Sequence, residues 1–161
     1  MTLNEYLKSA KFQAVQDEAL RDAALRAAEN ILREHVAVKR HQLHAIPSII
    51  QGAGLLGLRE MAQKQKEKNS NSKNKAFWSA IDDLLSATSV SEVSLYRFLQ
   101  TLLLESHFVE SEETSADKNT QKQIRRRNKV IIEGVMDDIL DVYFEHFNCH
   151  YFFKIQQGGS Q

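Results

Sequence analysis

Three side chains near the C-terminal end, His146, Cys149 and His150, are of types that bind zinc as imidazole and thiolate ligands. A zinc site needs further ligands at matching spacing, such as a CxxC pair. The nearest other candidates, His41 and His44, lie far away along the chain and form no such pair. We therefore interpret the segment as an aromatic helix end with partly exposed histidines, and we predict no metal site.

Carboxylates cluster on the segment that leads to those histidines, at Glu133, Asp137, Asp138, Asp141 and Glu145. A metal-dependent nuclease could use such a set. Acidic residues four apart on a helix repel each other when ionised, so a solvated face, or one that meets a basic partner, is the favoured interpretation. The sequence contains no Ser-His-Asp or Cys-His arrangement with a local signature. It therefore predicts a protein that is not an enzyme and has no cofactor.

Basic residues form two compact islands, although the formal net charge of the chain is zero. The zero total argues against indiscriminate nucleic-acid binding and allows two local anion sites. The second island opens the last predicted helix, where cations are locally unfavourable, and this points to an external anion or an acidic partner. A run of charges that is simply solvated is an equally good alternative. The candidate residues are Lys64, Lys66, Lys68, Lys73 and Lys75 in the first island and Arg125, Arg126, Arg127 and Lys129 in the second.

The length and composition of the chain limit the fold that carries these islands. The 161 residues suit one domain, assigned to 1–157 with a flexible tail at 158–161. Few glycines, one proline and long helical periodicities predict an all-α fold, an elongated bundle of about five helices. We expect no transmembrane helix and no signal peptide, and the single cysteine fits the cytoplasm.

The expected helices follow the apolar periodicity and the capping signals. Thr2 and Glu5 predict a capping box for the first helix, and Ser89 with Glu92 predicts another for the fourth. Pro47 is expected in the first turn of the second helix. The C-terminal aromatic segment could prolong the last helix or add a short strand. The predicted ranges are 2–44, 47–66, 75–87, 92–108 and 120–147.

Three glycines, Gly52, Gly54 and Gly57, lie inside the second predicted helix. Each costs about 1 kcal/mol relative to alanine, so their presence needs a reason. Close approach of a neighbouring helix is the favoured reason, and close approach of a ligand or nucleic-acid backbone is the alternative. The segment lacks the ending of a phosphate-binding loop, so nucleotide hydrolysis is not supported.

The string "VKRHQLHAIPSIIQGAGLLGLREMAQKQ", followed by a polar linker and "KAFWSAIDDLL", resembles a known family. The chain is similar over about residues 1–105 to the small helical subunit of CRISPR effector complexes, above all the type III Cmr and Csm forms. The "RRR" island and the aromatic end have no counterpart in that pattern. The residues that carry the resemblance are Lys39, Arg40, Ile46, Pro47, Ile49, Ile50, Gly54, Leu55 and Leu58.

The resemblance implies a subunit without catalytic activity, whose copies stack beside the backbone of the complex that binds the crRNA. Its partners would be other effector subunits, copies of itself, and the backbone of crRNA and target RNA, with no membrane. Lys39, Arg40 and the lysines of 64–75 would then face phosphates, while guide pairing supplies the sequence information.

Two other functions fit the same sequence. A helical adaptor would bind only protein, through the apolar face of 92–108 or the alanine-rich face of the first helix. A DNA-binding regulator would use "VSEVSLYRFLQTLL" as a helix-turn-helix, but this segment has few basic residues and is too apolar to read a groove, so it ranks last.

Overall fold

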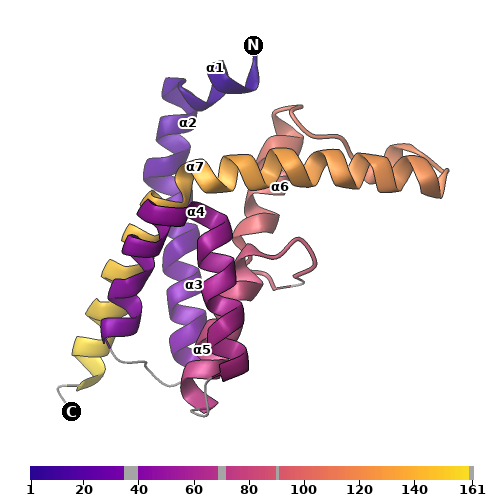
Figure 1. Cartoon of the computed structure of the whole chain (residues 1–161). Coiled ribbons are helices and arrows are strands. Elements are labelled where there is room, and N and C mark those ends of the chain that lie inside the picture. The colour runs from indigo at the N-terminus through magenta and orange to yellow at the C-terminus, as the bar shows by residue number, and fades with distance from the viewer. Residues whose placement is uncertain (35–39, 69–71, 90, 160–161) are drawn as a thin grey trace.

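The computed structural model describes residues 1–34, 40–68, 72–89 and 91–159, and every regular element within these ranges is helical. The fold is an all-α bundle, as predicted, and Figure 1 shows its elongated arrangement. The elements are α1 (Leu3–Leu7), α2 (Ala10–Val15), the π-helix η1 (Gln16–Leu20), α3 (Arg21–Glu34), α4 (Arg40–Lys68), α5 (Ser72–Leu85), α6 (Leu95–Glu105), the 3-10 helix η2 (Glu112–Thr114) and α7 (Lys118–Gly159).

The N-terminal region is not the single long helix that the periodicity predicted. The expected capping box is present, because Thr2 Oγ1 accepts from the Glu5 N–H at 3.2 Å and Glu5 Oε2 accepts from the Thr2 N–H at 3.0 Å. The helix then ends, and Ser9 starts α2 by accepting a hydrogen bond from the Phe12 N–H at 3.2 Å. Residues 35–39, where the predicted helix continued, lie outside the described residues.

The predicted second helix is divided at Gly54, which adopts a non-helical conformation at φ 62° and ψ −150°. Figure 1 shows that α4 rises to this point and then descends again as a second helical segment. The N–H of Leu55, exposed by the break, donates to Asp137 Oδ1 of α7 at 2.8 Å, so a residue distant in sequence caps the new helix end. Pro47 is interior to the first segment, because α4 begins at Arg40.

The three glycines of α4 meet different surroundings. A Cβ at Gly54 would overlap Asp137, so the predicted close approach of a neighbouring helix is confirmed at this position. A Cβ at Gly57 would overlap the side chain of Ala53, which the turn at Gly54 brings close. Nothing lies within 4 Å of the corresponding position at Gly52. Close approach of a neighbouring helix therefore explains Gly54 alone. Gly57 avoids a clash with Ala53 within the turn.

The fourth helix begins later than expected. Ser94, not Ser89, caps α6 by accepting from the Arg97 N–H at 3.2 Å. After α6 the chain reverses at His107, which has a positive φ of 63°. The N–H groups of His107 and Phe108 donate to the Leu104 and Leu103 carbonyls, the pattern of a Schellman C-cap. This reversal sends residues 110–117 back along α7.

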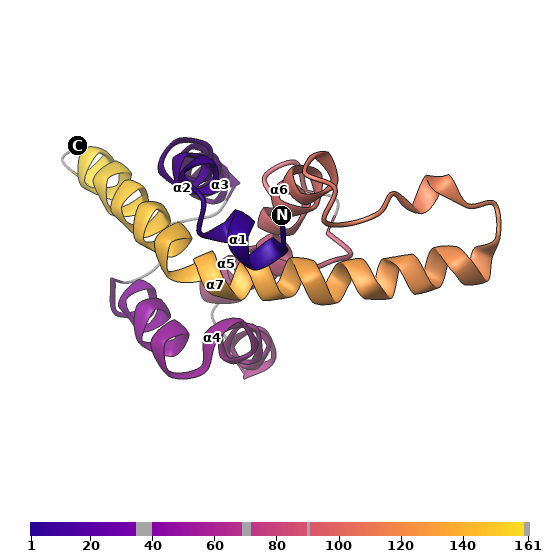
Figure 2. The ribbon, with the colours of Figure 1, turned by 90° about the horizontal axis from the view of Figure 1, so that it is seen from above.

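α7 has two parts, which we name the arm (residues 118–136) and the core half (residues 137–159). Figures 1 and 2 show the arm projecting from the body (orange) and the core half turning to run beside it (yellow). Near the bend the Val142 N–H donates to the carboxylate of its neighbour Asp141 at 2.8 Å. A side chain that enters the helical hydrogen-bond ladder is a recognised cause of bending.

The core half of α7 carries the aromatic end of the sequence, which prolongs the helix and does not form a strand. Phe147 and Tyr151 stack with ring centroids 5.8 Å apart, and Tyr151 contacts Phe77 of α5 at 6.0 Å. Phe147 and Tyr151 are fully buried. The helix runs through Gly158 and Gly159 of the expected tail, and residues 160–161 lie outside the described residues.

Candidate nucleic-acid interface

The basic arm lies against an acidic segment (residues 110–117) that precedes it in the chain. The arm carries six cations and no carboxylate between residues 118 and 129, whereas the acidic segment carries four carboxylates. Asn128 of the arm joins it to the acidic segment through two hydrogen bonds. Its Oδ1 accepts from the Glu110 N–H at 3.1 Å, and its Nδ2 donates to the Glu110 carbonyl at 2.6 Å. The acidic segment therefore has a defined position on one side of the arm.

Three of the four predicted cations of the second island pair with carboxylates of this chain. Arg125 donates from Nε and Nη2 to the two carboxylate oxygens of Glu112, both at 3.0 Å. Arg127 lies 3.8 Å from Glu110, and Lys129 lies 3.7 Å from Glu133. The Arg125 contact is bidentate and well formed, whereas the other two are long and exposed, and such pairs contribute little.

The hydrogen bonds from Arg125 lower the pKa of the Glu112 carboxyl below its ordinary value of 4.5. Because the folded-state pKa is lowered, the pair stabilises the fold above the unfolded-state pKa and is lost as the pH falls through the folded-state value. We predict that an NMR pH titration of the Glu112 carboxyl gives a midpoint below 4.5, and that Arg125→Gln raises this midpoint. An unchanged midpoint in Arg125→Gln would contradict the assigned partner.

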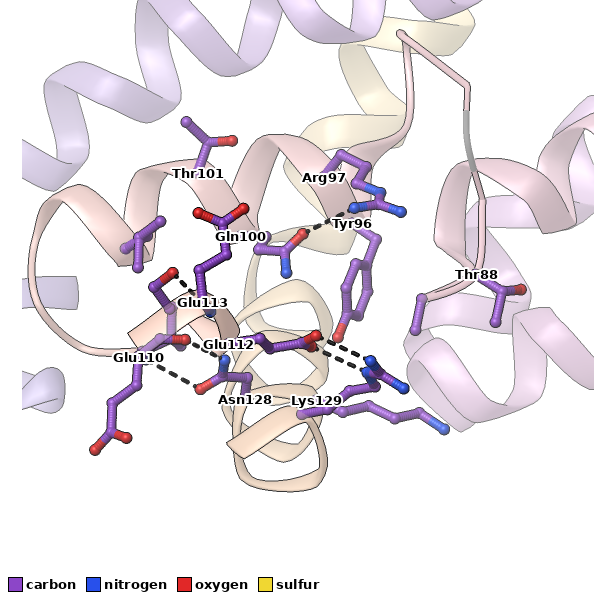
Figure 3. A pocket seen from close by; sticks show the side chains of 15 residues that line it. Thr88, Tyr96, Arg97, Gln100, Thr101, Glu110, Glu112, Glu113, Asn128 and Lys129 are labelled. Carbon is purple, nitrogen blue, oxygen red and sulfur yellow. Dashed lines mark hydrogen bonds and ion pairs between the residues drawn. The ribbon is translucent and has the colours of Figure 1, made fainter. Parts of the chain in front are cut away.

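A cleft of about 670 Å³ lies between α6 and the arm, and Figure 3 shows its side chains. In this view the Glu112 carboxylate points along the two dashed hydrogen bonds toward the guanidinium group of Arg125, whereas the Glu110 side chain points away from the cleft. Burial is the main cause that raises the Tyr96 pKa, and the nearby carboxylate charges of Glu133 and Glu112 add to it. Two further cations, Arg97 and Lys129, line the cleft.

The outer face of the arm has the cations that remain without a carboxylate partner. Lys118, Lys122 and Arg126 are exposed, and none of them pairs with a carboxylate among the described residues. Their spacing of four residues places them along one face of the helix, about 6 Å apart along its axis. We name this set the cationic stripe. Arg126 was predicted from the sequence, whereas Lys118 and Lys122 were not. Their spacing was the available signal, because Lys122 precedes Arg126 by four residues and Lys118 precedes Lys122 by four.

The first predicted island lies elsewhere on the molecule. Lys66 is partly buried and pairs with Asp82 of α5 at 3.2 Å. Lys64, Lys68 and Lys75 are exposed, and no carboxylate partner is found for them in the described part of the chain. Figure 1 shows the C-terminal end of α4 and the start of α5 at the bottom of the body and the arm at its top, so the two islands do not line one groove.

Three further residues predicted to bind phosphate cannot be placed. Lys39 lies outside the described residues, as do the side chains of Arg40 and Lys73.

The candidate metal ligands near the C-terminal end are not grouped. His150 lies 3.4 Å from Glu29 of α3, and Cys149 is exposed. Within the described ranges, no group of three His, Cys, Asp or Glu side chains is placed to hold a metal ion. In the same ranges, no helix combines the length and apolar character needed to span a bilayer.

Comparisons with protein-family models, with curated proteins and with solved structures found no match to this chain. The interpretation of the site therefore depends on its own geometry and charge.

Proposed function

We propose that this chain is a non-catalytic binding subunit that contacts the phosphate backbone of a nucleic acid through the cationic stripe. The observation that carries the proposal is the absence of carboxylate partners, among the described residues, for Lys118, Lys122 and Arg126. Exposed, unpaired cations can contact phosphates directly and release their counterions, whereas a cation in an ion pair must first break that pair.

The position of the stripe supports an extended, backbone-directed contact. The arm projects from the body, so its outer face is not covered by the other helices (Figures 1 and 2). Side chains in a row along one helix face suit a repeating chain of phosphates, and they carry no information about base sequence. Because the net charge of the chain is zero, the attraction comes from local groups of cations and not from the chain as a whole.

The specific form of this proposal is the role implied by the family resemblance. The chain would be the small subunit of a CRISPR effector, located in the cytoplasm, beside copies of itself and other subunits, and in contact with crRNA or target RNA. Lys64, Lys68 and Lys75 would supply a second phosphate contact at the far end of the body. Guide pairing would then supply the sequence recognition that the stripe lacks.

Salt-titrated binding of a fluorescent single-stranded uridine homopolymer tests the proposal. Three phosphate contacts predict a slope of about −2 for log affinity against log salt, which weakens binding about 20-fold between about 50 and 200 mM salt. Lys122→Glu combined with Arg126→Glu is expected to weaken binding at low salt by at least about tenfold and to flatten the slope. Fluorescence anisotropy measures both quantities.

A matched variant controls for the change in total charge. Arg21→Glu with Arg26→Glu changes the charge by the same amount at exposed positions of α3 and is expected to weaken binding far less. Equal losses in the two double variants would show that only net charge matters. Wild-type protein that does not bind at low salt would contradict the proposal.

A second candidate function, the protein adaptor, is favoured by two exposed aliphatic side chains. Leu56 is 70% exposed and Val130 is 74% exposed. Each is three residues from one partner of the Arg59–Glu133 ion pair, which joins α4 to the arm at 3.7 Å. An apolar contact of this kind would persist at high salt, so association that is insensitive to salt and is abolished by Leu56→Ser with Val130→Ser would favour the adaptor.

A further inference from the structure

The Glu112 carboxylate of the acidic segment contacts Arg125 of the arm with the geometry that a bound phosphate would have. Glu112 accepts two parallel hydrogen bonds from Arg125, both 3.0 Å long, and this bidentate geometry is shared by arginine–carboxylate and arginine–phosphate pairs. The side chain of Glu112 is 30% exposed and that of Arg125 is 64% exposed. Solvent therefore screens the pair, and a competing anion can reach it.

The surroundings of Glu112 are suited to an anion other than this carboxylate. Arg97 and Lys129 line the same cleft as Arg125, and Tyr96 lines it too (Figure 3). Arg97 Nε is held by the Ser89 carbonyl at 3.0 Å, which fixes the side chain at the cleft. Rotation of Glu112 out of the cleft would leave Arg97, Arg125 and Lys129 around a space of about 670 Å³, which Glu110 and Glu113 also line. The Glu110 side chain points away from this space (Figure 3), and Lys129 would still lie 3.7 Å from Glu133.

The backbone of the acidic segment need not move for this exchange. The two hydrogen bonds between Asn128 and the Glu110 backbone, at 3.1 and 2.6 Å, hold the segment on the arm independently of Glu112. Gln121 adds a hydrogen bond from Nε2 to the Ser115 carbonyl at 2.6 Å. A change in the Glu112 side chain alone is therefore sufficient to open the site.

We infer that the cleft between α6 and the arm is a phosphate-binding subsite that Glu112 fills in the free chain. This inference rests on the proposed function, because the phosphate is that of a nucleic acid already held by the cationic stripe. The bound nucleic acid would displace Glu112 and engage Arg125 from the cleft side. The acidic segment thus lowers the affinity of the arm for phosphates and makes binding depend on a polyanion long enough to reach both places.

A mutant cycle on Glu112 and Arg125 tests the inference, with binding of the uridine homopolymer as the readout. Glu112→Gln keeps the side-chain shape and removes the competing charge, so we expect about fivefold tighter binding at low salt and a salt slope steeper by about 0.7. Arg125→Gln added to Glu112→Gln is expected to remove this gain. Glu60→Gln makes the same change of charge at an exposed residue outside the cleft and is expected to leave affinity within about twofold of wild type.

A second readout separates the subsite from the proposed function. Titration with inorganic phosphate is expected to shift the Arg125 Nε–H resonance in Glu112→Gln and not in wild type. If no variant binds RNA but this shift occurs, the proposed function is wrong and the subsite is retained. Equal gains in Glu112→Gln and Glu60→Gln would overturn the inference, and so would a gain that persists without Arg125. Binding of the homopolymer by wild-type protein would leave the proposed function intact in either case.

Discussion

Replacing Gly54 by alanine is expected to lower the free energy of unfolding by about 3 kcal/mol, the largest effect of any glycine substitution in α4. An L-residue at φ 62° and ψ −150° is strained by about 1–3 kcal/mol. The new Cβ would also overlap Asp137 and disturb the cap on the Leu55 N–H, which adds a further cost of overpacking. Urea denaturation followed by far-UV circular dichroism measures the loss.

Two neighbouring glycines provide the controls. Gly52→Ala places a Cβ in open space on the same helix, so it is expected to stabilise the protein by about 0.5–1 kcal/mol. Gly57→Ala would overlap Ala53 and is expected to destabilise it by about 1–3 kcal/mol. Similar shifts for Gly52→Ala and Gly54→Ala would show that α4 does not turn at Gly54.

The second large effect is expected from Phe147→Ala, at about 3–5 kcal/mol of destabilisation. Phe147 has no exposed surface and contacts the rings of Tyr143, Phe144 and Tyr151. Its truncation would leave a cavity among these buried rings. Thermal and urea unfolding of the purified variant measure the loss.

Phe153 is the matched control, because it lies on the same helix and is 55% exposed. Phe153→Ala is expected to change the free energy of unfolding by no more than about 0.5 kcal/mol. If Phe147→Ala were equally mild, the aromatic end of the chain would not be part of the core, and a role in binding a partner would become the better interpretation.

The helical class could be predicted from sequence because it depends on local periodicity and composition. The capping box at Thr2 and Glu5 is equally local, and it was predicted correctly. The break at Ser9 was missed because the apolar spacing on either side of it continues the same helical phase. The turn at Gly54 could be suspected from the glycines. Asp137, which accepts from the Leu55 N–H next to this turn, lies 82 residues from Leu55 in the sequence, and no local pattern links the two.

In the candidate site, too, local sequence features could be predicted, whereas contacts with a separate segment of the chain could not. A run of cations is visible in the sequence, but its availability depends on which carboxylates fold back onto it. Arg125 and Arg126 are adjacent in sequence, yet Arg125 is bound by Glu112 and Arg126 faces outward on the arm. Helical phase from the arm's buried positions, Ile124 and Asn128, would have separated these two arginines.

The continuity of α7 has a mechanical consequence. The arm and the aromatic core belong to one helix, with the Asp137–Leu55 contact at the junction, so no slack linker separates them. A force on the free end of the arm therefore acts as a torque at that junction. Either the helix bends there or the whole body rotates with the arm. The resistance of the arm to bending therefore depends on the contacts at its base, among them the hydrogen bond between Asp137 and the Leu55 N–H.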